Sequence, residues 1–164
     1  MRTMFAHLLA SLVIILLTVT VCPTVLHAQT CGDGIWTARE SNRSWRSITS
    51  SSDGTKLAAV VYGGQIYTST DSGVTWTARE SNRNWESITS SSDGTKLAAV
   101  VYGGQIYTST NSGVTWTARE TNRSWRSITS SSDGTKLAAV VYDGQIYTSA
   151  IEQCDDGNNS AGDG

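Results

Sequence analysis

Several residue types are scarce in this chain, and each absence narrows its range of functions. The two histidines, His7 and His27, both precede residue 28, so the rest of the chain has none for catalysis or for a His-containing zinc site. Charged residues make up 16% of the chain and the net charge is -2. A nucleic acid or an anionic membrane requires a basic surface, and this composition indicates neither partner.

Long apolar runs are also rare, and the one that is present lies at the N-terminus. It extends from Leu8 to Val21, and Pro23 and Ala28 follow it. This order is typical of a secretory signal peptide over residues 1–28, and it predicts a secreted or cell-surface protein. A retained anchor is the alternative, although the run is shorter than the roughly 20 residues of a membrane span. Membrane contact is expected only through this segment.

Cysteine occurs three times, at positions 22, 31 and 154. Cleavage after Ala28 would remove Cys22 and leave one cysteine near each end of the mature chain. Because exported proteins meet an oxidising environment, we expect Cys31 and Cys154 to form a disulfide. The alternative is two unpaired thiols, each for a partner outside this chain.

What the chain has in abundance is repetition. Three near-identical copies of about forty residues occupy residues 36–75, 76–115 and 116–151. Their shared core, Ser-Ile-Thr-Ser-Ser-Ser-Asp-Gly-Thr-Lys-Leu-Ala-Ala-Val-Val-Tyr, begins at Ser47, Ser87 and Ser127. A period of this length is typical of the four-stranded blades of a β-propeller.

Each repeat divides into four predicted strands. In the first repeat these are residues 45–50, 56–62, 65–70 and 74–79, followed by a link over residues 80–84. Val, Ile, Thr, Tyr and Trp dominate the strands, and apolar residues do not recur at helical spacing, so a helical repeat is disfavoured. The prediction is an all-β fold of antiparallel propeller-type blades with twelve strands, in which a strand at Trp36 completes the last blade.

Three blades are fewer than the usual four to eight. The sequence leaves three explanations open: a fragment of a longer array, a homo-oligomer that closes the propeller, or blades that stack openly.

One turn motif carries the resemblance to known proteins. Ser-Thr-Asp-Ser-Gly-Val-Thr-Trp spans residues 69–76, and it returns with Asn in place of Asp at residues 109–116. The acidic side chain can accept backbone N–H groups, Gly permits a positive φ, and Trp re-enters the sheet. The motif resembles the Asp-box, or bacterial neuraminidase repeat, of sialidases, sortilin-type receptors and photosystem II assembly factors. The resemblance assigns structural roles to Ser69, Asp71, Gly73, Thr75, Trp76, Ser109, Asn111, Gly113, Thr115 and Trp116.

The two ends carry a second resemblance. Residues 29–35, with Cys-Gly-Asp-Gly-Ile, and residues 152–164, with Gln-Cys-Asp-Asp-Gly-Asn-Asn, look like the two halves of a cysteine-rich repeat of myxobacterial secreted proteins. The blades lie between these halves, and the second half is expected to be truncated. Its acidic residues suggest calcium, but they lack the ligand spacing of an EF-hand loop. No other cofactor is expected.

The near-identity of the three repeats argues against catalysis. Glycoside hydrolysis needs two carboxyl groups in different environments, whereas Glu40, Glu80 and Glu120 occupy equivalent positions. The chain also lacks the Arg-Ile-Pro motif that the sialidase resemblance implies. We therefore expect a non-catalytic module that binds a glycan or an extracellular protein. The alternative is a fragment of a sialidase-like glycoside hydrolase with its catalytic residues outside this chain.

Four positions that differ among the repeats suggest where a ligand would bind. They lie in the links, at the start of the first strand of each blade and in the turn between the second and third strands, so we expect them at one end of the blades. That end carries an arginine beside an aromatic residue and an amide, a combination that suits sugars and acidic peptides. The alternative is that tryptophan is core and arginine pairs with the neighbouring glutamate. The candidate binding face comprises Asn42, Arg43, Trp45, Asn82, Arg83, Trp85, Asn122, Arg123 and Trp125.

Overall fold

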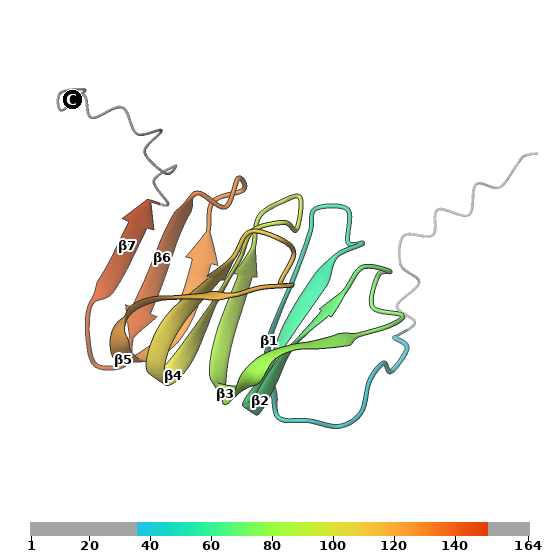
Figure 1. Ribbon diagram of the computed structural model, residues 1–164, viewed down its shortest axis with the longest axis horizontal. Coiled ribbons are helices and arrows are strands. Elements are labelled where there is room, and N and C mark those ends of the chain that lie inside the picture. The colour runs from blue at the N-terminus through green and yellow to red at the C-terminus, as the bar shows by residue number, and fades with distance from the viewer. Residues whose placement is uncertain (1–35, 151–164) are drawn as a thin grey trace, which may run out of the picture. The chain divides into compact units, whose positions relative to one another are not determined.

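The computed structural model describes residues 36–150, so the predicted signal peptide, both predicted cysteine-rich halves and the predicted Cys31–Cys154 disulfide lie outside the described residues. The strands are β1 (Trp45–Ser50), β2 (Leu57–Ser69), β3 (Thr77–Ser90), β4 (Leu97–Ser109), β5 (Thr117–Ser130), β6 (Lys136–Val141) and β7 (Ile146–Ala150) (Figure 1). All neighbouring strands are antiparallel, which confirms the all-β prediction. Within this range no helix is long and apolar enough to cross a membrane.

Each repeat folds into a blade whose strands pair in chain order. In blade 1, defined as residues 45–79, β1 pairs with the first half of β2, and the second half of β2 pairs with the start of β3. The same register returns forty residues later in blade 2, residues 85–119. Blade 3, residues 125–150, comprises the end of β5 with β6 and β7.

The predicted strands are joined into fewer and longer elements than the sequence suggested. The turn at Gly63-Gly64 and the link over residues 80–84 were expected to interrupt the strands, but β2 and β3 run through them. The reason is that Tyr62 remains paired with Asn84 and Gly64 with Arg83, so the turn and the link hold each other in strand conformation. The described residues therefore form seven strands, not twelve.

The prediction of an N-terminal strand at Trp36 is wrong for the single chain. Residues 36–44 contain no strand, although Thr37-Ala38-Arg39 repeats the sequence of the strand residues 77–79. Blade 3 accordingly has no fourth strand among residues 36–150.

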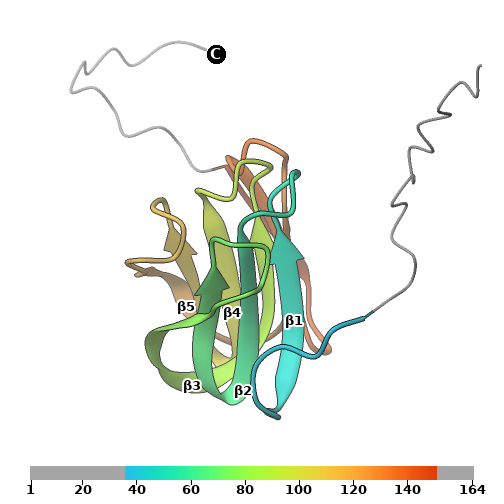
Figure 2. The same ribbon diagram turned by 90° about the vertical axis from the view of Figure 1, so that its right-hand side faces the viewer.

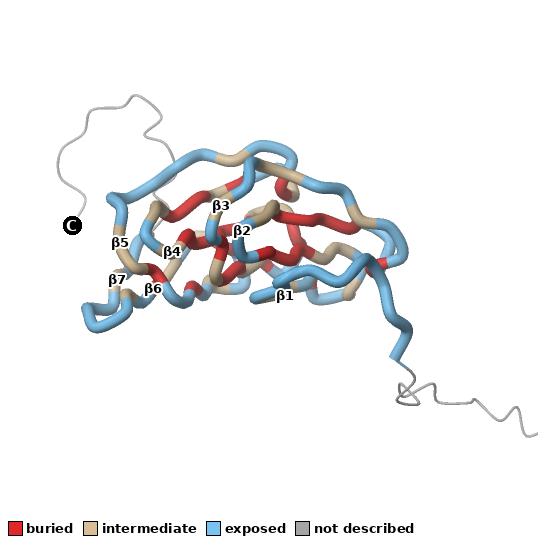
Figure 3. Tube along the Cα trace, turned by 90° about the horizontal axis from the view of Figure 1, so that it is seen from below, coloured by how far each residue is buried: buried red, intermediate tan, exposed pale blue. Residues whose placement is uncertain are grey.

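The hydrophobic core lies between consecutive blades. We call the side of a blade that faces the preceding repeat its front face, and the opposite side its back face. Trp85 and Ile88 on the front face of blade 2 pack with Val60 and Ile66 on the back face of blade 1. Figure 3 shows that buried residues concentrate on β2 and β4, whose apolar runs are buried on both sides as the sequence predicts. Each blade therefore depends on its neighbour for burial.

The Asp-box turn joins the third and fourth strands of a blade through its own side chains. Asp71 Oδ1 accepts hydrogen bonds from the Thr75 amide at 2.8 Å and from the Ser69 hydroxyl at 2.8 Å, and its Oδ2 accepts one from the Thr75 hydroxyl at 2.6 Å. The Gly73 amide donates to Ser69 Oγ, and the Trp76 indole donates to the Gly73 carbonyl at 3.0 Å. Gly73 has a φ of 83°, which glycine adopts without steric cost.

The second copy shows that the turn does not require a charge. Asn111 Oδ1 accepts from the Thr115 amide at 2.9 Å and from the Ser109 hydroxyl at 3.0 Å, as Asp71 Oδ1 does in the first copy. The Asn111 Nδ2 group donates to the Thr115 hydroxyl, which reverses the direction of that one hydrogen bond. An amide and a carboxylate thus fold the same turn.

We predict that the Asp-box carboxylate contributes to the loss of folding stability at low pH, and that replacing it changes this pH dependence. Hydrogen bonds from the Thr75 hydroxyl and amide, and then from Ser69, lower the pKa of Asp71 to about 2. A carboxyl whose pKa is lower in the folded chain stabilises it above about pH 4, and that contribution is lost as the pH falls toward 2. Asp71→Asn should therefore flatten the fall of the urea unfolding midpoint across this range, measured by circular dichroism.

The reciprocal change is the matched control. Asn111→Asp adds an equivalent titrating group to the second turn and should steepen the same dependence. Equal slopes in wild type and both variants would show that these turns do not contribute to acid sensitivity.

We also predict that equivalent isoleucines contribute unequally to stability. Ile88 is 4% exposed between blades, whereas Ile48, its counterpart in blade 1, is 63% exposed. Ile88→Ala should lower the free energy of unfolding by about 2–5 kcal/mol through lost burial and a residual cavity. Ile48→Ala should cost less than about 1 kcal/mol in urea unfolding at high dilution. Equal losses at that dilution would contradict burial between blades.

Candidate binding surface

Four of the positions that differ among the repeats gather at one end of the blades, as the sequence predicts: position 41, position 44, position 46 and position 63, with their equivalents. Pairing of Tyr62 with Asn84 and of Gly64 with Arg83 places the turn inside β2 beside the link inside β3, and β4 and β5 repeat this arrangement. We call this the variable end. The Asp-box lies at the opposite end, where the Ser72 amide donates to the Thr55 carbonyl of the neighbouring turn.

In two of the three repeats, the tryptophan of the predicted binding face is buried in the hydrophobic core. Trp85 and Trp125 are fully buried, whereas Trp45 is 37% exposed because no blade covers the front of blade 1 among the described residues. Each indole also contacts its own link: Trp85 Nε1 donates to the Ser81 carbonyl and Trp125 Nε1 to the Thr121 carbonyl. Trp85 and Trp125 are therefore not accessible for stacking on a ligand.

The arginines of that face are held by two neighbours each. Arg83 lies over the Tyr107 ring, 4.6 Å from its centre, and forms an ion pair with Glu80 at 3.5 Å. Arg43 and Arg123 repeat this arrangement in the other copies. The Nε atoms of Arg83 and Arg123 are buried without a hydrogen-bond partner, which fits guanidinium groups packed flat in the fold. The sequence predicted the glutamate partner as an alternative but did not predict the tyrosine.

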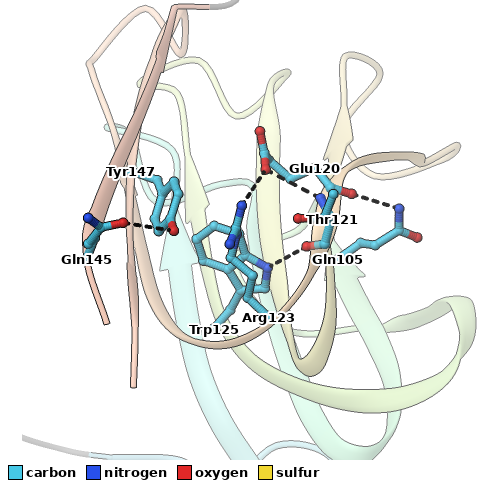
Figure 4. A network of polar contacts seen from close by, with 7 residues as sticks. All are labelled: Gln105, Glu120, Thr121, Arg123, Trp125, Gln145 and Tyr147. Carbon is cyan, nitrogen blue, oxygen red and sulfur yellow. Dashed lines mark hydrogen bonds and ion pairs between the residues drawn. The ribbon is translucent and has the colours of Figure 1, made fainter. Parts of the chain in front are cut away.

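Figure 4 shows the third copy of this cluster. Arg123 points between Glu120 and the Tyr147 ring, and Gln105 Nε2 donates to the Glu120 carbonyl at 2.9 Å. Glu120 has a φ of 57°, and its counterparts Glu40 and Glu80 have 58° and 56°. The glutamates thus shape the link as well as pair with arginine. Asn42, Asn82 and Asn122 are exposed beside these clusters.

A second set of side chains at the variable end is more accessible. We call it the arginine–tyrosine strip, and it comprises Arg46, Tyr62, Glu86, Tyr102, Arg126 and Tyr142. Glu86 accepts from Arg126 at 2.8 Å and lies 3.7 Å from Arg46 Nε, so one carboxylate joins all three blades. Arg46 lies over Tyr62, and Arg126 lies over both Tyr102 and Tyr142.

The strip combines exposure with net positive charge. The Arg46 and Arg126 side chains are 47% and 43% exposed, whereas the Glu86 side chain is 10% exposed. Tyr142 is 56% exposed. Two guanidinium groups share one buried carboxylate, so their outer N–H groups and the tyrosine faces remain accessible to an acidic or sugar-like ligand. The sequence identified position 46 and its equivalents as variable, but it gave no signal that the tyrosines join them.

Hydrogen bonds within the turns lower the pKa of the aspartates that follow the first strand of each blade. Asp53 has its pKa lowered to about 2, first by the Ser51 hydroxyl and then by the Thr55 amide and hydroxyl. Equivalent hydrogen bonds lower the pKa of Asp93 and Asp133. Residues 36–149 also contain no group of three or more His, Cys, Asp or Glu residues arranged to hold a metal ion.

Comparison with known proteins identifies the fold. No protein-family model matches the chain, and no curated protein matches it. YCF48 bound to D1 peptide is similar at 16% identity with a TM-score of 0.58, over 69% of this chain and 40% of that one. YCF48 from Cyanidioschyzon merolae is similar at 17% identity with a TM-score of 0.61, over 73% of this chain and 38% of that one.

An enzyme shares the architecture as well. The GH74 enzyme of Niastella koreensis is similar at 22% identity with a TM-score of 0.53, over 71% of this chain and 17% of that one. The chain spans about two fifths or less of the length of these three structures. At these identities the likeness is one of fold: the described residues have the blade architecture of part of a β-propeller.

Proposed function

We propose that the chain is a non-catalytic binding module of the cell exterior, which takes an acidic glycan or an acidic segment of a protein at its variable end. The arginine–tyrosine strip is the observation that carries this proposal. Arg46 and Arg126 each lie on a tyrosine ring, and both form an ion pair with the Glu86 carboxylate, at 3.7 and 2.8 Å. A preorganised guanidinium loses little freedom when it binds a carboxylate, so the strip suits a ligand that carries carboxylates in series.

The distribution of sequence differences supports the same end of the molecule. The core and turn residues are repeated almost without change, whereas position 46 and its equivalents alternate as Arg, Glu and Arg, and Gly63 and Gly103 correspond to Asp143. Identical repeats would offer three equal weak sites, but the alternation makes one site that spans the blades.

The state of the carboxyl groups supports a role without catalysis. A general acid needs a pKa raised toward neutrality, and the pKa values of Asp53, Asp71, Asp93 and Asp133 are all lowered by hydrogen bonds. Glu40, Glu80 and Glu120 are paired with arginines in equivalent positions. The peptide-bound YCF48 structure offers a precedent for a peptide ligand on this fold.

Binding to a glutamate-rich peptide and to an oligogalacturonate, both measured by isothermal titration calorimetry, tests the proposal. Arg126→Gln should weaken binding about tenfold by removing one charge-assisted contact. Binding should also weaken as salt is added. The two probes share the carboxylate, so a preference for one identifies the ligand class.

The matched control removes one positive charge elsewhere. Arg119 is exposed on β5, where its Nε donates to the Thr108 hydroxyl at 3.4 Å, and it is not part of the strip. Arg119→Gln should leave the affinity within about twofold of wild type. Equal losses in the two variants would reject the strip, absence of binding to both probes would reject an acidic ligand, and hydrolysis of a fluorogenic sialoside would reject the non-catalytic role.

A further inference from the structure

Within the described residues, two blade faces have no neighbouring blade: the front of blade 1 and the back of blade 3. The same two kinds of face pack together at both junctions inside the chain, between blades 1 and 2 and between blades 2 and 3. On the front of blade 1, Trp45 is 37% and Ile48 63% exposed, whereas their counterparts Trp85, Ile88, Trp125 and Ile128 are at most 6% exposed. On the back of blade 3, Ile146 is 72% exposed, whereas Ile66 is fully buried. Figure 2 shows β1 at the front edge of the blades.

Each of the two end blades also carries a hollow. A hollow of 460 Å³ on blade 1 is lined by Trp45, Ile48, Leu57, Ala59 and Trp76 among others. A hollow of 470 Å³ on blade 3 is lined by Leu137, Ala138 and Thr148 together with polar neighbours. Exposed apolar surface of this kind is costly unless it is covered.

The polar contacts between blades follow a fixed pattern, and within residues 36–150 the groups at the two ends of the series have no partner from another blade. The Lys56 ammonium donates to the Asp93 carbonyl at 3.0 Å, and Lys96 repeats this contact with Asp133 at 3.1 Å. The Ser52 amide donates to the Ser92 carbonyl and the Ser92 amide to the Ser132 carbonyl, both at 2.7 Å. The next members in this series are the Lys136 ammonium and the Ser132 amide on blade 3, and the Asp53 and Ser52 carbonyls on blade 1.

The segment before blade 1 supplies the missing strand of blade 3. Thr37-Ala38-Arg39 has the sequence of residues 77–79, which pair with Thr68, Tyr67 and Ile66 as the fourth strand of blade 1. The link that follows already has its repeat conformation, because Glu40 has a φ of 58° and pairs with Arg43 at 3.6 Å. Residues 37–39 are exposed and form no strand, although they occupy the place in the repeat of a fourth strand for a preceding blade.

We propose that a second copy of this chain covers these faces, so that the back of blade 3 packs on the front of blade 1 of the next copy. Residues 37–39 of that copy then add to β7, with Thr37 opposite Thr148, Ala38 opposite Tyr147 and Arg39 opposite Ile146. Two copies joined in this way contain six blades, within the usual range of a closed propeller. The occupant is a copy of this chain because both halves of the interface, and the strand that completes it, are present in one sequence.

One charge contact opposes the association. Inside the chain each junction places an arginine beside Glu86, but the junction between copies places Arg126 near Arg46 of the next copy without a carboxylate between them. The association should therefore strengthen as salt screens the two guanidinium groups, the opposite of the salt dependence of an ion-paired interface.

Light scattering on the full chain tests the proposal, with a reducing agent present to prevent cross-linking through cysteines. The wild type should have the mass of two chains and should dissociate on dilution. Ala38→Pro should give the mass of one chain, because proline disrupts the added strand but residues 37–39 form no strand in the single chain. Ile146→Asp should do the same by placing a charge on the back face.

Two controls separate loss of association from loss of folding. Val114→Asp changes an apolar residue that is 55% exposed at the Asp-box end, and it should leave the mass unchanged. Ala118→Pro, the internal counterpart of Ala38→Pro, should lower the urea midpoint because Ala118 pairs with Tyr107 within blade 2. Ala38→Pro should keep the midpoint of the dissociated wild type.

A cross-link tests the strand exchange directly. Chains with Cys22, Cys31 and Cys154 replaced by serine, one carrying Thr37→Cys and the other Thr148→Cys, are mixed and treated with a short bis-maleimide. A covalent pair that forms only in the mixture supports the proposal. A wild-type mass of one chain at every concentration, an oligomer that survives both Ala38→Pro and Ile146→Asp, or no cross-link in the mixture would overturn it.

Discussion

The structure depends on one constraint: a blade buries its apolar residues against another blade and not within itself. Trp85 has no exposed surface because blade 1 lies in front of it, and its equivalent Trp45 is partly exposed for want of such a neighbour. The turns, links and charges are consistent with this requirement, because each positions a blade so that its face meets the next. The Asp-box fixes one end of blades 1 and 2, and a glutamate–arginine–tyrosine cluster fixes the other end of all three blades.

Much of the fold could be predicted from the sequence because its signals are local. The forty-residue period, the apolar run at residues 57–61 and the Ser-Asp-Gly-Thr-Trp spacing each specify short-range geometry, and the structure has the corresponding blades, buried strands and turns. The continuity of β2 and β3 could not be predicted, because it depends on pairing between Tyr62 and Asn84 across the sheet. From local sequence alone, the glycine pair in β2 and the polar link in β3 predict breaks in the strands.

The candidate site was less predictable, for a similar reason. The sequence placed Arg43 beside Trp45, but the ring under that arginine belongs to Tyr67, 24 residues further along the chain. The arginine–tyrosine strip requires contacts between repeats, and no periodic pattern within one repeat indicates which copies of a side chain meet. Comparison of the repeats did indicate the end of the blades at which most of the differences lie. Glu86 meets Arg46 and Arg126 only because the three blades lie side by side.

The position of blade 2 also has a consequence for the dynamics of the single chain. Blade 2 is covered on both faces, and the Leu97–Val101 segment of β4 is buried throughout, whereas Val140 and Ile146 in blade 3 are exposed. Local opening of a repeat protein proceeds from the parts with fewest buried contacts, so the end blades should unfold before the middle one. Amide hydrogens of β4 should accordingly exchange with solvent most slowly, and fraying from both ends would leave a folded centre that can direct the end blades back into place.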